Sequence, residues 1–124
     1  MAAESAHAER ERRAGKNQSL FRDVNERVND VNKEHGLWVT LSDWVCECAD
    51  DTCTERIELT PQQYEWVREQ PTRFIVAPSK EHVVFDVERV VEQRERYWVV
   101  STVGEAAAVA VQLDPRSQDG SSYV

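Results

Sequence analysis

The chain has 124 residues, of which 40% are hydrophobic and 31% are charged, and its formal net charge is −8. This length supports one domain with a modest core, and no apolar run approaches the ~20 residues of a membrane-spanning helix. Residues 1–15 are polar and charged, without the apolar stretch of a secretory signal, so we expect a cytoplasmic protein.

The acidic excess lies outside the N-terminal part of the chain. Residues 1–35 contain seven basic and seven acidic side chains, so the other 89 residues contain eight basic and sixteen acidic ones. An acidic body repels phosphate groups, which argues against nucleic acid as a partner, and we expect no membrane partner either. Proteins with basic patches fit this charge better, although solubility alone explains it equally well.

The first element is expected to be a helix that follows a flexible, charged extension at residues 1–16. A helical pattern extends from about residue 8 to residue 35, and Gly36 fits a left-handed stop. Five apolar residues fall on one face of this helix, so they must pack against another surface. We therefore expect self-association, or binding to a protein partner, through the N-terminal helix. The apolar stripe comprises Leu20, Phe21, Val24, Val28 and Val31, and the opposite, charged face comprises Arg22, Asp23, Glu26, Arg27, Asp30 and Lys33.

Three short segments follow this helix. Residues 37–45 are rich in Trp, Val and Leu, and we interpret them as a short strand or turn. Residues 46–54 form a tight loop that contains all three cysteines and two aspartates. Residues 57–59 are expected to be a short extended piece.

The clearest local signal in the chain marks the start of a second helix. Thr60 is a favourable N-cap, and Pro61 suits the first helical position. Gln63 can complete a capping box with Thr60. This helix is expected to end before Pro71, because the residue that precedes a proline disfavours helical geometry.

The last third of the chain is expected to contain a hairpin and a third helix. Residues 74–77 resemble a short strand, and residues 83–92 and 97–103 are rich in Val and aromatic side chains. The polar residues 93–96 separate these last two runs, as in an antiparallel hairpin. Residues 105–113 then favour a small helix of Ala and Val.

These elements predict an α+β fold: an N-terminal amphipathic helix, a Cys-rich knuckle, a short helix, a small mainly antiparallel sheet and a C-terminal short helix. Residues 17–113 are expected to form one zinc-stabilised domain, and residues 114–124 a loose tail. The tryptophans suffice to form most of a small core. They are Trp38, Trp44, Trp66 and Trp98.

The motif that carries chemistry is a group of three cysteines within eight residues, Cys46, Cys48 and Cys53. An odd number of cysteines does not suit a disulfide framework. Thiolates bind Zn²⁺ at about 2.3 Å, and a folded loop can direct three of them toward one ion. The spacing therefore predicts a zinc site in this loop.

A closed structural zinc site requires a fourth ligand. His82 is the first candidate, because it lies in a turn between expected strands and imidazole is a common zinc ligand. His35 is the second, since it ends the first helix shortly before the cysteines. Asp50 or Asp51 is the third, and all of these stay open at the level of sequence.

Two other interpretations of the cysteines compete with zinc. Free cysteines are often buried hydrophobic residues, but Glu47, Asp50 and Asp51 make this loop too polar for a core segment. A thiol redox sensor is the alternative function, although nearby acidic groups are expected to raise thiol pKa values and disfavour the reactive thiolate. No phosphate-binding loop, dinucleotide fingerprint or nucleophile motif is recognised, so we expect a binding or regulatory module and not an enzyme.

Five segments are suggestive together: residues 19–27, Val45-Cys46-Glu47-Cys48 with Cys53, and residues 71–78, 88–92 and 103–106. With these segments the chain resembles a family of small, uncharacterised bacterial proteins, of a type frequent in actinobacteria. The resemblance covers roughly residues 17–116 and implies a shared fold and a cysteine site, with no known activity. In that family a histidine closely follows an Ala-Pro pair, whereas here Ser79-Lys80-Glu81 separates Pro78 from His82.

Overall fold

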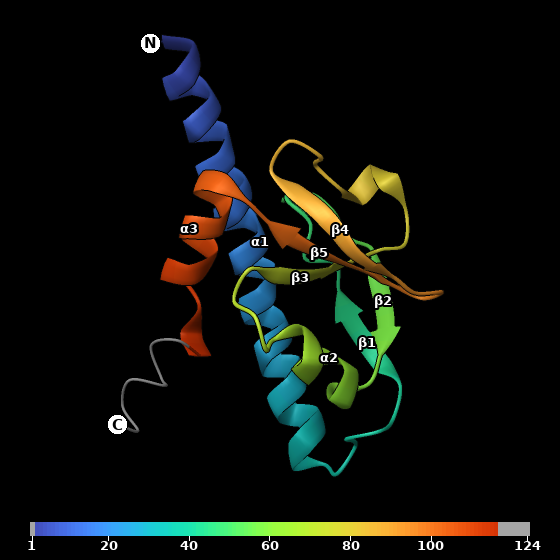
Figure 1. The fold of residues 1–124 in the computed structure, drawn as a ribbon. Helices are drawn as coiled ribbons and strands as arrows, with labels where there is room; N and C mark the ends of the chain where they lie inside the picture. The colour runs from blue at the N-terminus through green and yellow to red at the C-terminus, as the bar shows by residue number, and fades with distance from the viewer. Residues whose placement is uncertain (1, 117–124) are drawn as a thin grey trace.

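The structure, a computed structural model, describes residues 2–116 and has the expected α+β architecture. A long helix runs along one side of the molecule, a short helix packs beside it, and two small antiparallel sheets lie across from them (Figure 1). None of the helices within residues 2–116 has the length and apolar character that a membrane span requires. The elements are α1 (Ala2–Glu34), β1 (Ser42–Val45), β2 (Arg56–Leu59), α2 (Pro61–Val67), β3 (Arg73–Val76), the 3₁₀ turn η1 (Lys80–His82), β4 (Glu88–Gln93), β5 (Trp98–Thr102) and α3 (Gly104–Gln112).

The strands form two sheets, and the cysteine loop joins the strands of the smaller one. β1 pairs antiparallel with β2, and in the larger sheet β5 lies between β3 and β4. The predicted hairpin is confirmed, although its first strand begins only at Glu88. The preceding segment turns instead, because the backbone N–H groups of Val87 and Glu88 both donate to the Val84 carbonyl.

Two predicted helix ends are confirmed in detail. The Thr60 hydroxyl accepts a hydrogen bond from the Gln63 N–H at 3.1 Å, and the Gln63 side chain accepts one from the Thr60 N–H at 2.9 Å. Gly36 ends α1 with φ of 71°, a left-handed conformation that glycine adopts without a steric penalty. The N–H of Leu37 then donates to the Asn32 carbonyl.

The N-terminal part of the chain differs from the expected flexible extension at residues 1–16. Residues from Ala2 onward belong to α1, and Ala14 and Gly15 are buried where the helix meets α3. A Cβ atom added to Gly15 would lie only 2.9 Å from the Ala106 carbonyl oxygen, so the two helices approach closely because this residue has no side chain. The Glu11 carboxylate also accepts a hydrogen bond from the N–H of Glu105, at the first turn of α3.

The faces of α1 are oriented in a way that the hydrophobic pattern does not predict. Polar side chains of α1 face the core, whereas three residues of the apolar stripe are exposed: Leu20 by 58%, Val24 by 41% and Val31 by 53%. Most of the buried polar side chains form hydrogen bonds to the rest of the domain, which offset part of the cost of desolvation. They are Gln18, Ser19, Arg22, Asn25 and Asn29.

The core lies between the two sheets, α2 and α3, and of the four tryptophans only Trp44 is fully buried. Its ring lies 4.6 Å from that of Tyr64, centroid to centroid. Trp38 and Trp66 are substantially exposed, so the expectation that the tryptophans form most of the core is wrong for both. Tyr64, Phe74 and aliphatic residues of β2, β3 and β5 occupy that space instead.

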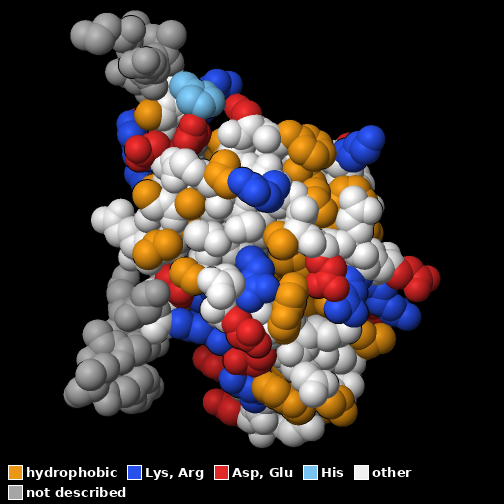
Figure 2. All heavy atoms as spheres, in the orientation of Figure 1, with side chains coloured by type: hydrophobic (Ala, Val, Ile, Leu, Met, Phe, Trp, Pro, Cys, Tyr) orange, Lys and Arg blue, Asp and Glu red, His pale blue; other side chains and the backbone are white. Residues whose placement is uncertain are grey.

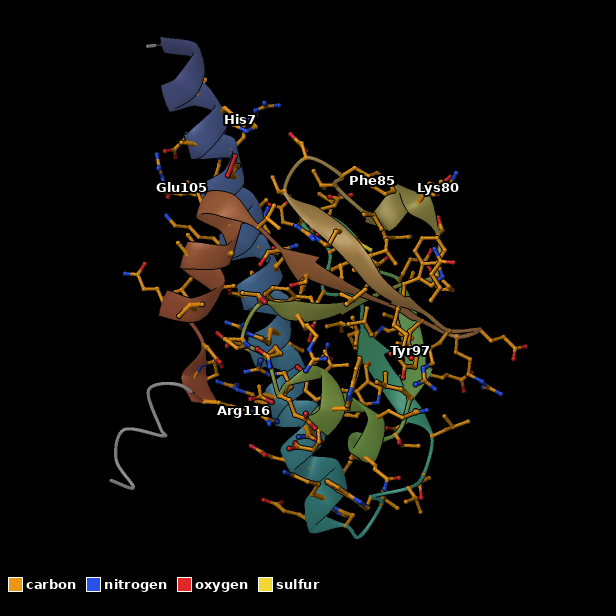
Figure 3. All side chains as sticks on the ribbon, in the orientation of Figure 1. His7, Lys80, Phe85, Tyr97, Glu105 and Arg116 are labelled. Atoms are coloured by element: carbon orange, nitrogen blue, oxygen red, sulfur yellow. The ribbon has the colours of Figure 1, made fainter. Side chains whose placement is uncertain are left out.

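The end of the described chain is held against α1 and α2 rather than loose. The buried Arg68 side chain pairs with Asp114, and the Arg116 guanidinium binds both Glu26 and Glu65 at 2.7 Å. Burial opposes ionisation of Glu65, but Arg116 and Asn29 outweigh it and lower its pKa to about 2. Figure 2 shows acidic and basic side chains gathered between the end of α3 and α2, and Figure 3 shows Arg116 reaching toward that region. The remainder of the expected tail, residues 117–124, lies outside the described residues.

Candidate metal centre

Four potential ligands from three parts of the chain meet at one point. Cys46 and Cys48 directly follow β1, Cys53 shortly precedes β2, and His82 ends the 3₁₀ turn between β3 and β4. Their ligand atoms all lie within 4.8 Å of one another. The structure therefore brings together the three cysteines and the first candidate for the fourth ligand, and this cluster could hold a metal ion.

Two of the separations between these atoms are close to those of a tetrahedral site. Nδ1 of His82 lies 3.7 Å from Sγ of Cys46 and also 3.7 Å from Sγ of Cys53. An ion with metal–sulfur bonds of about 2.3 Å and a metal–nitrogen bond of about 2.0–2.1 Å places neighbouring ligand atoms roughly 3.6–3.8 Å apart. The cluster can thus close around one ion with only small movements.

The three thiols of the cluster differ in the direction in which their pKa values are shifted. Hydrogen bonds with Cys46 and, to a lesser extent, with His82 lower the pKa of the Cys48 thiol to about 5, although burial opposes this shift. The same Cys46–Cys48 hydrogen bond, together with burial, raises the pKa of Cys46, and burial raises the pKa of Cys53. The sequence-based expectation that the acidic neighbours raise the thiol pKa values is therefore wrong for Cys48. The acids do not face it: Glu47 is turned into the core, and the exposed Asp50 carboxylate accepts hydrogen bonds from Thr52.

Backbone hydrogen bonding supports Cys46 from β3. The N–H of Ala77, just beyond the last residue of β3, donates to Sγ of Cys46 over 3.3 Å. A hydrogen bond from a backbone N–H stabilises the negative charge of a buried thiolate. This bond therefore favours a metal-bound sulfur at Cys46. Cys46 and Cys48 are buried and Cys53 is partly exposed, so the cluster has one side near solvent.

Glu47, between the first two cysteines, connects the loop to the rest of the domain. Its side chain is fully buried, and its carboxylate accepts hydrogen bonds from the Asn25 side chain, the Tyr64 hydroxyl and the Ile75 N–H, at 2.8–3.0 Å. The Glu47 N–H in turn donates to the Ile75 carbonyl over 2.7 Å. Burial raises the pKa of Glu47, and these three donors oppose that shift. Glu47 therefore fixes the direction in which Cys46 and Cys48 leave β1, by joining the loop to α1, α2 and the edge of β3.

The loop that carries His82 is ordered by its own cap and by Glu88. The Ser79 hydroxyl caps the 3₁₀ turn by accepting a hydrogen bond from the Glu81 N–H at 3.1 Å. Beyond the turn, the Glu88 carboxylate accepts a hydrogen bond from the Val84 N–H at 3.0 Å. Lys80 and Phe85 mark the two sides of this loop in Figure 3, beside β4.

The other candidates for the fourth ligand are placed elsewhere. Nδ1 of His35 makes a 2.9 Å hydrogen bond to the Val31 carbonyl at the end of α1, and this residue is not part of the cluster. The carboxylates of Asp50 and Asp51 are exposed and are not part of it either. Sequence reasoning missed the role of Glu47, for which a signal exists: in an extended segment alternate side chains point in opposite directions, so Glu47 must face away from both cysteines.

Comparisons of this chain with models of protein families, with curated proteins and with solved structures find no match. The resemblance to a family of small bacterial proteins therefore stays a prediction. The features available for assigning a function are the four clustered ligands, their supporting hydrogen bonds and the surfaces of the domain.

Proposed function

We propose that Cys46, Cys48, Cys53 and His82 bind one structural Zn²⁺ ion. The observation that carries this proposal is the convergence of these four ligand atoms within 4.8 Å of one another. Three thiolates and one imidazole form a donor set that favours zinc over Mg²⁺ or Ca²⁺, which prefer oxygen ligands. Four protein ligands complete a tetrahedron and leave no position for a reactive water, as is typical of structural rather than catalytic sites.

The ion would connect two loops that are distant in sequence. It would join the β1–β2 loop, which supplies three ligands, to the β3–β4 loop, which supplies His82. Such a bond between the two sheets stabilises the folded state, because the unfolded chain does not present the ligands together. We therefore assign the metal a structural role and regard the protein as a non-catalytic binding or regulatory module.

The module is proposed to act in the cytoplasm by binding protein. Three unpaired thiols are maintained in a reducing compartment. The exposed apolar residues of α1 offer a surface for a protein partner, since a stripe of this kind is otherwise unfavourable in water. The acidic excess outside α1 disfavours nucleic acid as the partner.

Cobalt substitution tests the metal assignment directly. Replacing zinc with Co²⁺ in the purified full chain should give the intense visible bands of tetrahedral cobalt and the charge-transfer bands of cobalt–thiolate bonds. The variant His82→Ala should shift or abolish these bands, whereas the matched variant His35→Ala should leave them unchanged. Bands that are insensitive to His82→Ala would show that another residue supplies the fourth ligand.

A thiol redox sensor is the second candidate function, favoured by the low pKa of Cys48 and the partial exposure of Cys53. In this function a peroxide would oxidise two thiolates to a disulfide, be reduced itself to water, and release the metal. Mild peroxide treatment followed by thiol counting distinguishes the two functions. Three thiols that remain unmodified while the metal stays bound would exclude the sensor.

A further inference from the structure

The outer face of α1 has the properties of an interface without its partner. The outer face of α1 is defined by the exposed apolar residues Leu20, Val24 and Val31 together with Asp23 and Arg27. These residues line a shallow groove along the helix. The opposite face of α1 is already occupied by the polar contacts to the core, so this helix cannot rotate to bury its apolar stripe within the chain. The stripe needs a surface from another molecule.

Four of the charged residues that border this stripe follow an order that is complementary to its own reverse. From the N-terminal end they are Lys16, Asp23, Arg27 and Glu34, that is, basic, acidic, basic and acidic. With 100° between successive residues of an α-helix, all four lie on the same flank of the apolar stripe. All four side chains are exposed, and none forms an ion pair with another described residue.

We infer that a second copy of this chain covers the outer face of α1, in an antiparallel, two-fold symmetric helix pair. An axis that crosses α1 at the level of Asn25 brings the same flank of both helices together. Asp23 then lies beside the partner's Arg27, and Lys16 lies beside the partner's Glu34. The two-fold axis repeats each of these two pairs, so the dimer contains four contacts between opposite charges.

The apolar residues fit the same register. Leu20 comes to the level of the partner's Val31, and Val24 meets its own equivalent near the axis. Phe21 and Val28, which are partly exposed on the other flank, also come to the same level across the pair. The apolar surface of each helix is thus covered by the apolar surface of the other over most of the contact length.

The overall charge of the chain supports this choice of partner. The N-terminal 35 residues have no net charge, whereas the remaining 89 residues account for the full −8. Two copies repel each other least when they meet through the neutral helix. A basic protein would bind an acidic surface of the domain more favourably than α1, which has no net charge.

This inference deepens the proposed protein-binding function by naming the partner, and it is tested by measuring the mass of the full chain in solution. Sedimentation equilibrium should give a dimer for the wild-type protein. Val24→Asp should give a monomer with unchanged zinc content and helicity, because this residue is exposed in the single chain. The control Val111→Asp, which changes a similarly exposed valine of α3, should leave the dimer intact.

Charge reversal tests the antiparallel register itself. Asp23→Arg and Arg27→Asp should each weaken self-association by about tenfold or more, because like charges then meet twice. A mixture of these two variants should form heterodimers, and the double variant Asp23→Arg/Arg27→Asp should recover the wild-type dimer. Dimers form in both experiments only if residue 23 of one copy lies beside residue 27 of the other.

Three results would overturn this inference. One is a wild-type protein that remains monomeric at high concentration, the second a dimer that Val24→Asp leaves unaffected, and the third a failure of the charge-reversed variants to complement each other. A monomer that retains zinc and binds a different protein through Val24 would overturn self-association while leaving the proposed function standing. A protein that dimerises but binds no metal would contradict the proposed metal site and leave self-association standing.

Discussion

The three consecutive residues Cys46, Glu47 and Cys48 contribute to two different sites. The two thiols face the candidate metal centre, and the carboxylate faces the core, where three donors hold it. A carboxylate buried without these donors would cost several kcal/mol. The hydrogen-bonded position of Glu47 therefore explains why the loop leaves β1 with both sulfurs on the same side.

The substitution Cys48→Ala should remove bound zinc and destabilise the domain. One ligand of four is lost, and the binding energy of a structural metal contributes directly to folding. We expect the zinc content to fall from about one ion per chain to near zero and the free energy of unfolding to fall by at least about 2 kcal/mol. Metal analysis and thermal unfolding measure both, with Asp51→Ala, an exposed change in the same loop, as the control. An unchanged melting temperature in Cys48→Ala would contradict this prediction.

The buried Glu88 carboxyl should give the domain a pH-dependent stability. Burial raises its pKa from 4.5 to about 7, against the opposing hydrogen bonds from Val84 and Gln18. The folded state therefore binds this proton more tightly than the unfolded chain. The stabilising contribution is fully present below the unfolded pKa and is lost as the pH rises through about 7.

Between pH 5 and pH 8, the wild-type protein should lose about 2–3 kcal/mol of stability relative to Glu88→Gln. The amide cannot ionise, and its NH₂ group can donate to the buried Gln18 Oε1 atom, which lacks a partner, if the Gln18 amide turns over. Denaturant unfolding at a series of pH values measures the difference, and the exposed Glu95→Gln serves as the control. Parallel pH curves for wild type and Glu88→Gln would exclude this effect.

At the scale of elements, α1 organises the domain through polar contacts on its inner face. Arg22 is fully buried, donates to the carbonyls of Pro71 and Ala110, and stacks on the Phe74 ring with its guanidinium carbon 5.0 Å from the ring centroid. Asn25 binds both the Val45 carbonyl and its N–H, which fixes the start of the cysteine loop. The helix is thus the common support for α3, for β1 and for the candidate metal centre.

The contact between α1 and α3 should depend on the absence of a side chain at residue 15. The substitution Gly15→Val would place a branched side chain against the Ala106 carbonyl and the Val109 side chain, which forces the helices apart. We expect a loss of about 1–3 kcal/mol in the free energy of unfolding, despite the better helix propensity of valine. Denaturant unfolding measures the loss, and Arg10→Val, at an exposed site on α1, should have little effect. Equal stabilities of the two variants would show that the contact is not tight.

At the scale of the whole molecule, features encoded by neighbouring residues could be predicted, and those that depend on distant contacts could not. The capping box at Thr60, the stop at Gly36 and the β4–β5 hairpin follow from local chemistry, and all three are present. The clustering of the three cysteines follows from their spacing. The approach of His82 depends on how the β3–β4 loop folds back, so sequence alone left three candidates for the fourth position.

The orientation of α1 was not predictable, because periodicity identifies an apolar face but does not specify what covers it. Here the inner face is polar, and groups from α2, β1 and the loops, none of which is adjacent in sequence, form hydrogen bonds with it. Arg22 belongs to the face that the pattern assigned to solvent, yet it is fully buried. The apolar face is left for a partner, as the proposed dimer requires.

The measurement that tests the central claim most directly is elemental analysis of the purified chain, combined with unfolding before and after chelation. We predict one zinc ion per chain and a large loss of stability when a chelator removes it, because the four ligands then no longer connect the two sheets. Protein that contains no metal and yet unfolds with the same stability and cooperativity would contradict the account.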